Sequence, residues 1–341
     1  MKKEIQVLTT FDLTKEQQER LTKASDRVKL TVIPASEPNA VPDERWAETE
    51  VLYTWDVLPE PDKAPNLKWV QLGMAGVDPF LDSPLVQRED TVLTSMSGAI
   101  VSQIAEYVLM ALLAFGHHLP KMVRNQREHI WPDQKERSEG FLPLELRHST
   151  VGILGYGSIG RQVARLLQPF GAEILAAKRD VMHPEDLSYM PEGMGDPQGE
   201  FFTRLYPMEA MNSMLSSCDY VVVALPLTGK THHILGSLAF EAMKETAYLV
   251  NVGRGALIDE AALTEALKDG KITGAMLDVF EEEPLPEDSP LWDMENVLIS
   301  PHVSGFSSHL QDETFELFVE NLNRYLTGLS LYNQVDLKKG Y

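Results

Sequence analysis

Cysteine is almost absent from this chain of 341 residues, because Cys218 is the only one. A lone cysteine excludes an intrachain disulfide and is typical of proteins that fold in a reducing compartment. Long hydrophobic runs are absent too, since the longest, at about 107–115, is far shorter than the ~20 residues that span a bilayer. No apolar signal core follows Lys2 and Lys3. We therefore expect a cytoplasmic protein.

Positive charge is scarce as well. The chain has 30 Lys and Arg residues against 51 Asp and Glu residues, a formal net charge of −21. This balance argues against a protein that binds nucleic acid, and nothing in the sequence points to a membrane partner. Metal-ligand spacing is missing, because Cys218 stands alone and the histidine pairs 117–118 and 232–233 are adjacent in sequence. Hydrophobic content of 43% and the chain length predict a globular protein with two domains.

A glycine-rich turn between two predicted strands is the central feature of what is present. The apolar strand 151–154 runs into Gly155-Tyr156-Gly157-Ser158-Ile159-Gly160, an amphipathic helix follows, and a second apolar strand spans 174–177. In this context Gly-x-Gly-x-x-Gly is the fingerprint of a dinucleotide-binding fold. The first glycine permits the tight turn, the second lets the backbone approach a pyrophosphate, and the third lets the helix pack on the sheet. We therefore predict a dinucleotide site here, with the phosphates at the helix N-terminus.

The end of the second strand bears on the choice between NADP and NAD. A site that prefers NAD has a carboxylate near this point to bond the ribose hydroxyls. Here Lys178 and Arg179 come first, and Asp180 follows. Two cations suit a 2′-phosphate, so NADP is favoured. NAD stays open, because a shift of the strand end by one residue would bring Asp180 to the ribose.

Strands and helices alternate along most of the chain, which predicts parallel α/β domains. Predicted strands cover 4–10, 28–33, 51–55, 69–72, 92–95, 220–225, 247–251, 274–278 and 297–300, and predicted helices cover 15–23, about 99–115, 208–216, 237–244, 259–268 and about 311–327. We interpret the Pro- and Gly-rich segment 181–200 as a tolerated surface loop, with a lid or an oligomer contact as the alternatives. Cys218 precedes an apolar strand, so a buried structural role is expected rather than a nucleophile.

Three short motifs follow predicted strands in the second half of the chain. They are Asn-Val-Gly-Arg-Gly at 251–255, Asp-Val-Phe-Glu-Glu-Glu-Pro at 278–284 and Ser-Pro-His at 300–302. Ligands of open α/β sheets bind beyond the carboxyl ends of the strands, so these motifs can converge on one site. There, Arg254 could polarise a carbonyl, His302 could exchange a proton, and a carboxylate could orient the imidazole.

Together the motifs resemble the D-isomer-specific 2-hydroxyacid dehydrogenase family over nearly the whole chain. The matching segments, in the family's order, are GILGYGSIGR, ALPLTGKTHHIL, LVNVGRGALIDEAAL, GAMLDVFEEEPLP and ISPHVSG. Two earlier segments are also similar, QLGMAGVD at 71–78 and SGAIVSQIAEYVLMALL at 97–113. The ending VDLKKGY resembles the glyoxylate/hydroxypyruvate reductase branch.

The resemblance implies a role for each catalytic candidate. Arg254 would bind the substrate and polarise its carbonyl, His302 would be the acid/base, and Glu283 would be its partner, since the family's glutamate directly precedes a proline. The N–H groups of Ala75 and Gly76 would bind the substrate carboxylate.

The resemblance also implies the cofactor contacts. Asp278 would hold the nicotinamide carboxamide. The other expected contacts are Gly155, Tyr156, Gly157, Ser158, Ile159, Gly160, Lys178, Arg179, Leu225, Pro226, Thr231, Val252, Gly253, Arg254, His302 and Gly305.

The family's architecture would divide this chain into two domains. A Rossmann nucleotide-binding domain with a doubly wound parallel sheet would span 104–302. A flavodoxin-like α/β substrate domain would combine 1–103 with 303–341, with a cleft at two hinges. The family further implies a homodimer in which helix 99–117 and its extension form an arm.

We therefore predict an NAD(P)H-dependent enzyme that reduces a small 2-oxo acid of the glyoxylate or hydroxypyruvate type to the D-2-hydroxy acid. One alternative is an NAD-linked dehydrogenase of another hydroxy acid, such as 3-phosphoglycerate. The other is a non-catalytic NAD(H)-sensing protein on the same fold, as in the C-terminal-binding-protein corepressors. Arg254, Glu283 and His302 do not decide between these, because such sensors can keep all three residues.

Overall fold

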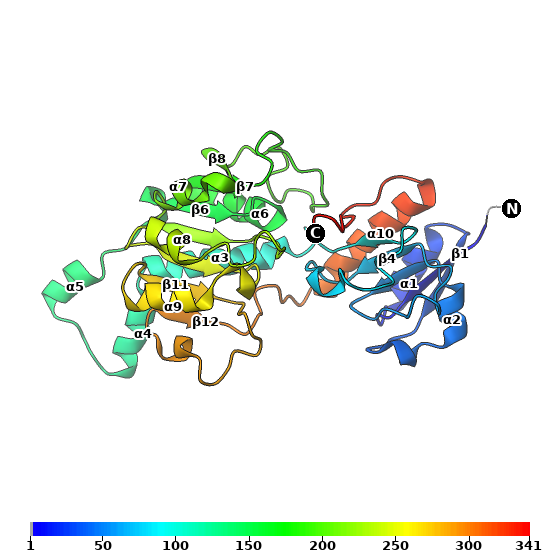
Figure 1. The fold of residues 1–341 in the computed structure, drawn as a ribbon, viewed down its shortest axis with the longest axis horizontal. Helices are drawn as coiled ribbons and strands as arrows, with labels where there is room; N and C mark the ends of the chain where they lie inside the picture. The colour runs from blue at the N-terminus through cyan, green and yellow to red at the C-terminus, as the bar shows by residue number, and fades with distance from the viewer. Residues whose placement is uncertain (1–2) are drawn as a thin grey trace. The chain divides into compact units, whose positions relative to one another are not determined.

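The structure is a computed structural model that describes residues 3–341, and the chain forms two compact units in it (Figure 1). Unit 1 contains the chain up to Ile100 together with Ser188–Pro191 and Ser307–Tyr341, and unit 2 contains Val101–Leu187 and Glu192–Phe306. The domain boundaries expected at 103/104 and 302/303 therefore differ by three and four residues from those in the structure. Residues 188–191, expected in the nucleotide domain, pack in unit 1. Among the helices of the described range, none is both long and apolar enough to cross a membrane.

Unit 2 is built on a seven-stranded sheet in which all neighbouring strands are parallel. Its strands are β6 (Thr150–Leu154), β7 (Glu173–Lys178), β8 (Arg204–Pro207), β9 (Tyr220–Val223), β10 (Tyr248–Asn251), β11 (Gly274–Leu277) and β12 (Val297–Ile299). The strand order is β12-β11-β10-β9-β6-β7-β8. The order reverses between β6 and β9, which is the doubly wound Rossmann arrangement and its switch point. This part of the fold prediction is confirmed.

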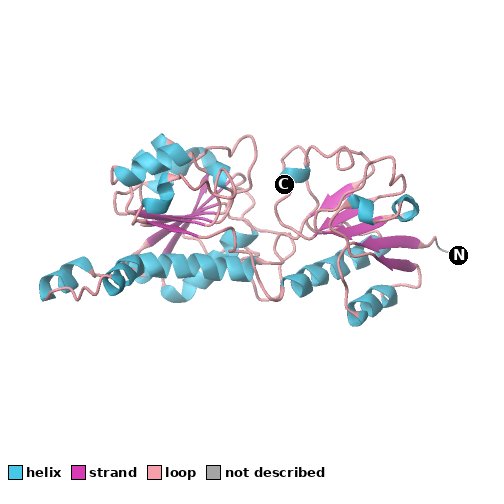
Figure 2. Cartoon of the chain, turned by 90° about the horizontal axis from the view of Figure 1, so that it is seen from below, coloured by secondary structure: helices cyan, strands magenta, loops and turns pink. Residues whose placement is uncertain are grey.

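Helices cover both faces of this sheet, as Figure 2 shows. The helices of unit 2 are α3 (Val101–Gly116), α4 (Leu119–Arg127), α5 (Gln134–Gly140), α6 (Ser158–Leu167), α7 (Met211–Leu215), α8 (Ser237–Ala242) and α9 (Glu260–Lys268), with short 3-10 turns η3 (Leu146–His148), η4 (Gln168–Phe170), η5 (Met208–Ala210), η6 (Gly255–Leu257) and η7 (Pro290–Asp293). Of these, α4 and α5 extend away from the sheet (Figure 1). Because both faces are covered, all four residues of β9 are buried. Cys218 lies in the same core, and burial raises the pKa of its thiol to about 12. The expected structural role of this cysteine is confirmed.

Unit 1 contains a five-stranded parallel sheet in the order β2-β1-β3-β4-β5. The strands are β1 (Ile5–Thr9), β2 (Val28–Val32), β3 (Val51–Thr54), β4 (Trp69–Leu72) and β5 (Val92–Thr94), and the helices are α1 (Lys15–Lys23), α2 (Asp43–Glu48) and α10 (Leu310–Thr327), with 3-10 turns η1 (Pro38–Ala40) and η2 (Asp78–Phe80). This strand order is that of flavodoxin-like folds, as expected. Helix α10 joins the core, where Phe318 stacks on Tyr53 with ring centroids 4.3 Å apart. It ends at Gly328, whose φ of 75° is the left-handed cap that the sequence predicts.

The segment 181–200 has no helix or strand and connects β7 to β8. Its middle, residues 188–191, belongs to unit 1, where the Tyr189 N–H donates to Asn333 Oδ1 at 3.2 Å. The rest belongs to unit 2 and includes Asp196, which is buried. The segment is thus fixed by specific contacts rather than loosely attached.

Candidate active site

The three motifs lie side by side because their strands are neighbours in the sheet. In the parallel register, Asn251 of β10 pairs with Leu277 of β11, and Leu277 pairs with Ile299 of β12. The turns that follow, 252–255, 278–284 and 300–305, therefore leave the same edge of the unit 2 sheet. This is the edge at which ligands of such sheets bind.

An imidazole–carboxylate pair occupies two of these turns. His302 Nδ1 lies 2.8 Å from Glu283 Oε2, and both side chains are partly exposed. The other carboxylate oxygen, Glu283 Oε1, accepts the Phe280 N–H at 3.0 Å, which fixes the carboxylate. Of the other two glutamates in the motif, Glu281 accepts a backbone N–H from α9 and Glu282 is exposed. The structure therefore pairs Glu283 with His302 and leaves Nε2 of the imidazole as the nitrogen that can meet a substrate.

Asp278 is completely buried and holds the turn that carries His302. Its Oδ1 accepts from Ser300 Oγ at 2.6 Å and from the Val303 N–H at 2.8 Å, while Oδ2 accepts the Ser304 N–H at 2.9 Å. Its carbonyl oxygen accepts the His302 N–H at 2.9 Å. His302 has a φ of 52°, a left-handed conformation that these bonds maintain. A contact between Asp278 and a nicotinamide stays a prediction.

Two residues extend this network. Ser300 Oγ lies 2.5 Å from the hydroxyl of Tyr107 on α3. Burial raises the pKa of Tyr107 to about 12, so this hydroxyl keeps its proton. Ser300 lies inside the Ser-Pro-His motif, but no sequence signal connects Tyr107 to it.

Arg254 stands at the end of the turn after β10. Its Nη1 donates to Gly253 O at 2.9 Å. The turn is closed by Asn251, which is fully buried, donates from Nδ2 to Arg254 O at 3.0 Å, and accepts the Gly253 N–H at 3.0 Å. Sequence reasoning missed this role of Asn251, although the residue opens the Asn-Val-Gly-Arg-Gly motif.

The glycine turn has the geometry of a dinucleotide cradle. Gly155 has a φ of 100°, and a side chain there would meet the Ala224 carbonyl at 2.6 Å. At Gly160 a side chain would lie 2.3 Å from Gly155 O, so this glycine permits the close packing of α6. At Gly157 a side chain would meet nothing within 4 Å, so the backbone there faces open space. Helix α6 begins at Ser158 and Ile159, whose N–H groups lie at its positive end, so the turn fits a pyrophosphate.

At the end of β7, the two cations expected at a 2′-phosphate, Lys178 and Arg179, lie in different surroundings. Lys178 Nζ donates to His183 O at 2.7 Å and lies 3.5 Å from Glu185 O, so the ammonium group faces the segment 181–200. The pKa of Lys178 is lowered, mainly by burial and then by the positive charge of Arg161. Arg179 is exposed. Asp180 pairs with His183 at 2.9 Å and accepts the Met182 N–H, and these bonds hold the pKa of its carboxyl below the usual range.

The remaining cofactor candidates follow β9, β10 and β12. Leu225 and Pro226 directly follow β9, and Thr231 Oγ1 donates to Pro226 O at 2.7 Å to close that turn. Val252 is buried and donates its N–H to Val223 O. Gly305 O accepts from Gln103 Nε2 at 3.3 Å. All of them lie at the carboxyl edge of the unit 2 sheet.

In unit 1, Ala75 and Gly76 lie in the loop that follows β4. Within residues 3–341 their N–H groups donate to no protein acceptor, so they are open to an anion. The loop starts at Gly73, where a side chain would meet Phe11 at 2.5 Å and Trp55 at 2.8 Å.

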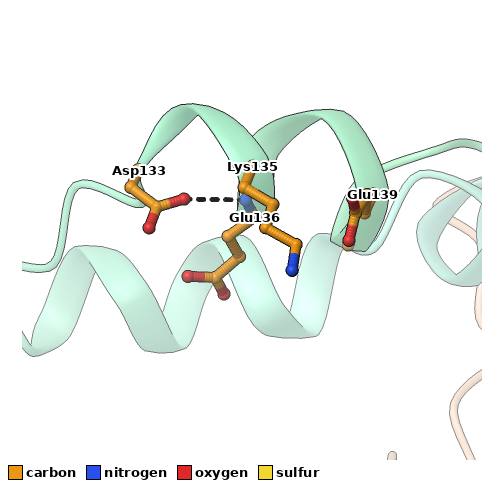
Figure 3. A pocket seen from close by; sticks show the side chains of 5 residues that line it. Asp133, Lys135, Glu136 and Glu139 are labelled. Atoms are coloured by element: carbon orange, nitrogen blue, oxygen red, sulfur yellow. Dashed lines mark hydrogen bonds between the residues drawn. The ribbon is translucent and has the colours of Figure 1, made fainter.

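A surface hollow elsewhere contains none of these residues. It lies along α5 and is lined by Asp133, Lys135, Glu136, Glu139 and Gly140 (Figure 3). Asp133 accepts the Glu136 N–H at 2.8 Å, which caps the helix. We assign no ligand to this hollow.

Sequence similarity agrees with this geometry. The profile described as "D-isomer specific 2-hydroxyacid dehydrogenase, NAD binding domain" matches residues 109–304. The chain is 31% identical over 265 residues to glyoxylate/hydroxypyruvate reductase B of Pectobacterium carotovorum subsp. carotovorum, covering 78% of each protein. It is 32% identical over 284 residues to D-3-phosphoglycerate dehydrogenase of Methanocaldococcus jannaschii, covering 83% of this chain and only 50% of that relative.

Structural similarity extends over the whole chain. A D-isomer specific 2-hydroxyacid dehydrogenase from Xanthobacter autotrophicus Py2, solved in complex with NADPH and MES, has a TM-score of 0.81 and 29% identity. The match covers 99% of this chain and 100% of that one. On the profile match, the relatives and the shared fold, this chain belongs to the D-isomer-specific 2-hydroxyacid dehydrogenase family and contains its NAD-binding domain.

Proposed function

We propose that this protein uses NADPH to reduce a small 2-oxo acid, of the glyoxylate or hydroxypyruvate type, to the D-2-hydroxy acid. The observation that carries the proposal is the His302–Glu283 pair at 2.8 Å, on a turn fixed by Asp278 and beside the turn that carries Arg254. The glyoxylate/hydroxypyruvate reductase relative, which this chain matches over 78% of its length, supports the substrate class. The D-stereochemistry follows from the family.

Each side chain has one task in this reaction. The nicotinamide, when bound, supplies a hydride to the carbonyl carbon of the substrate. The Arg254 guanidinium binds the substrate and stabilises the negative charge that grows on the carbonyl oxygen. His302, protonated and oriented by Glu283 through Nδ1, donates the proton to that oxygen from Nε2. A contact of the Ala75 and Gly76 N–H groups with the substrate carboxylate stays a prediction of the family resemblance.

We favour NADPH because of what surrounds the end of β7. Asp180, the carboxylate that could bond the ribose hydroxyls of NAD, is already paired with His183 and the Met182 N–H. Arg179 is exposed and gives this region a cation that suits a 2′-phosphate. The structural neighbour from Xanthobacter autotrophicus was solved with NADPH. NAD is the alternative cofactor.

Two other functions compete with this one. An NAD-linked 3-phosphoglycerate dehydrogenase is favoured by two relatives of that name, but the chain spans only 50% and 48% of their lengths. A sensor of NAD(H) would bind the dinucleotide and would reduce no oxo acid. Turnover of glyoxylate, of hydroxypyruvate or of 3-phosphoglycerate, measured beside dinucleotide binding, separates all three functions.

We further propose a cytoplasmic homodimer that uses the region from α3 to Leu142, just after α5. Apolar side chains are exposed along it, with Trp131 84%, Leu142 65% and Met110 47% exposed. Such a group of exposed apolar side chains is typical of a protein–protein interface.

The test is steady-state reduction of glyoxylate and of hydroxypyruvate with NADPH and with NADH. The proposal expects turnover, a preference for NADPH, and loss of that preference in Arg179→Ala. Tight dinucleotide binding without turnover of any of these acids would instead favour the sensor.

A further inference from the structure

The segment 181–200 is attached to the glycine turn and α6 through buried polar groups. A tolerated surface loop needs no such groups, because burying a charge is costly unless it is paired and hydrogen-bonded. Two charged residues of this attachment, Arg161 of α6 and Asp196 of the segment, are 0% and 2% exposed.

Arg161 connects the helix to three points of the segment. Its Nη1 donates to Asp196 O and its Nη2 donates to Pro184 O. Its Nε lies 3.2 Å from Asp186 Oδ2, at the distance of an ion pair. The planar guanidinium thus binds two separate parts of the segment at once, through donors that it holds in a fixed geometry.

Asp196 connects the segment to the glycine turn. Its Oδ2 accepts from the Tyr156 hydroxyl at 2.6 Å and from the Phe201 N–H at 2.9 Å, while Oδ1 accepts the Glu200 N–H at 2.9 Å. Next to it, the Gly195 N–H donates to Gln162 Oε1 at 2.6 Å. The buried carboxylate is therefore fully used in joining the segment to Tyr156 and to itself.

Tyr156 is the residue through which this attachment reaches the cofactor turn. It stands between Gly155 and Gly157, whose lack of side chains leaves the turn free to adopt many backbone conformations. Its ring is 1% exposed, meets Phe202 edge to face at 5.1 Å, and lies 4.8 Å from the Arg161 guanidinium. Fixing this one side chain fixes the turn on both sides of it.

We propose that Tyr156, Arg161 and Asp196 are positioning residues that hold the glycine turn in its dinucleotide-binding geometry. The segment 181–200 then belongs to the cofactor site, and this inference rests on the proposed function in one respect, that the turn binds NAD(P)H. The same segment binds Lys178 at the end of β7 through the His183 carbonyl, so it organises two parts of the site.

The test compares two Tyr→Phe variants that each lose one hydroxyl. Tyr156→Phe removes the bond to Asp196. Tyr220→Phe is the matched control, because Tyr220 is 0% exposed and its hydroxyl donates to Leu144 O at 2.9 Å, at the amino end of β9. Dissociation constants for NADPH and NADH are measured by calorimetry, together with thermal midpoints, and KM and kcat are measured with the oxo acid.

We expect Tyr156→Phe to raise the dinucleotide Kd and KM roughly fivefold to tenfold, as the loss of one buried hydrogen bond implies, with kcat at saturation nearly unchanged. Tyr220→Phe should lower the thermal midpoint about as much as Tyr156→Phe does, and it should leave the dinucleotide Kd unchanged. In a cycle with Asp196→Ala, the double variant should bind as weakly as Asp196→Ala alone, because alanine leaves the Tyr156 hydroxyl without its acceptor.

Equal Kd values for the wild type and Tyr156→Phe would overturn the inference and leave the proposed function intact. Additive effects in the cycle would overturn it as well. Failure of the wild type to bind either dinucleotide would overturn the proposed function itself.

Discussion

Replacing Asp278 by asparagine tests how the site is held together. The change keeps the size of the side chain and replaces one carboxylate oxygen by an NH₂ group. Three donors converge on this carboxylate, two on Oδ1 and the Ser304 N–H on Oδ2. An asparagine loses the fewest hydrogen bonds when its NH₂ takes the Oδ2 position. There the NH₂ faces the Ser304 N–H, and because both groups are donors that hydrogen bond is lost.

The expected cost follows from that geometry. Asp278 is fully buried, so the Ser304 N–H gains no water in place of the lost acceptor. A hydrogen bond to a charged group contributes about 1.5–3 kcal/mol, and the two bonds that remain become neutral and weaker. We expect a loss of about 2–3 kcal/mol, which lowers the thermal midpoint of a unit of this size by roughly 4–12 °C. Since the turn positions His302, kcat/KM should fall at least about tenfold, which is part of the roughly 10²- to 10⁴-fold that a positioned acid–base group contributes.

Thermal unfolding and steady-state kinetics of Asp278→Asn are compared with those of Asp219→Asn. Asp219 accepts the Thr150 N–H and the Lys244 ammonium, each at 2.8 Å, at the amino edge of the same sheet. The control should lose stability and keep kcat/KM. A wild-type midpoint and wild-type kcat/KM in Asp278→Asn would refute the role given to this carboxylate.

Other predictions concern single groups. Arg254→Ala should lower kcat/KM by about two to three orders of magnitude while dinucleotide binding survives, and near-wild-type turnover would defeat its assignment. Trp131→Glu should shift the mass measured by light scattering from dimer to monomer, and an unchanged mass would remove Trp131 from the interface.

Much of the fold was predictable because its determinants are local in sequence. Buried strands such as β9 form continuous apolar runs, and the order of the motifs places their turns on one sheet edge. Helix ends were less predictable. The expected helix 208–216 begins as a 3-10 turn after Pro207 and is α-helical only over Met211–Leu215, because the first turn of a helix often tightens into 3-10 geometry.

The site was less predictable where its partners are distant in sequence. Lys178 was expected to face a 2′-phosphate, but its ammonium meets the carbonyls of His183 and Glu185. The segment 181–200 has the composition of a loose loop, and only the fold shows that Asp196 is buried against Tyr156. Local composition cannot reveal a carboxylate whose donors come from another turn.

The measurement that tests the central claim most directly is reduction of glyoxylate and hydroxypyruvate by the wild type and by Arg254→Ala, each with NADPH and NADH. The account predicts turnover by the wild type with a preference for NADPH, and loss of turnover in the variant with its dinucleotide Kd retained. Tight binding of both cofactors by the wild type, without reduction of either acid, would contradict it.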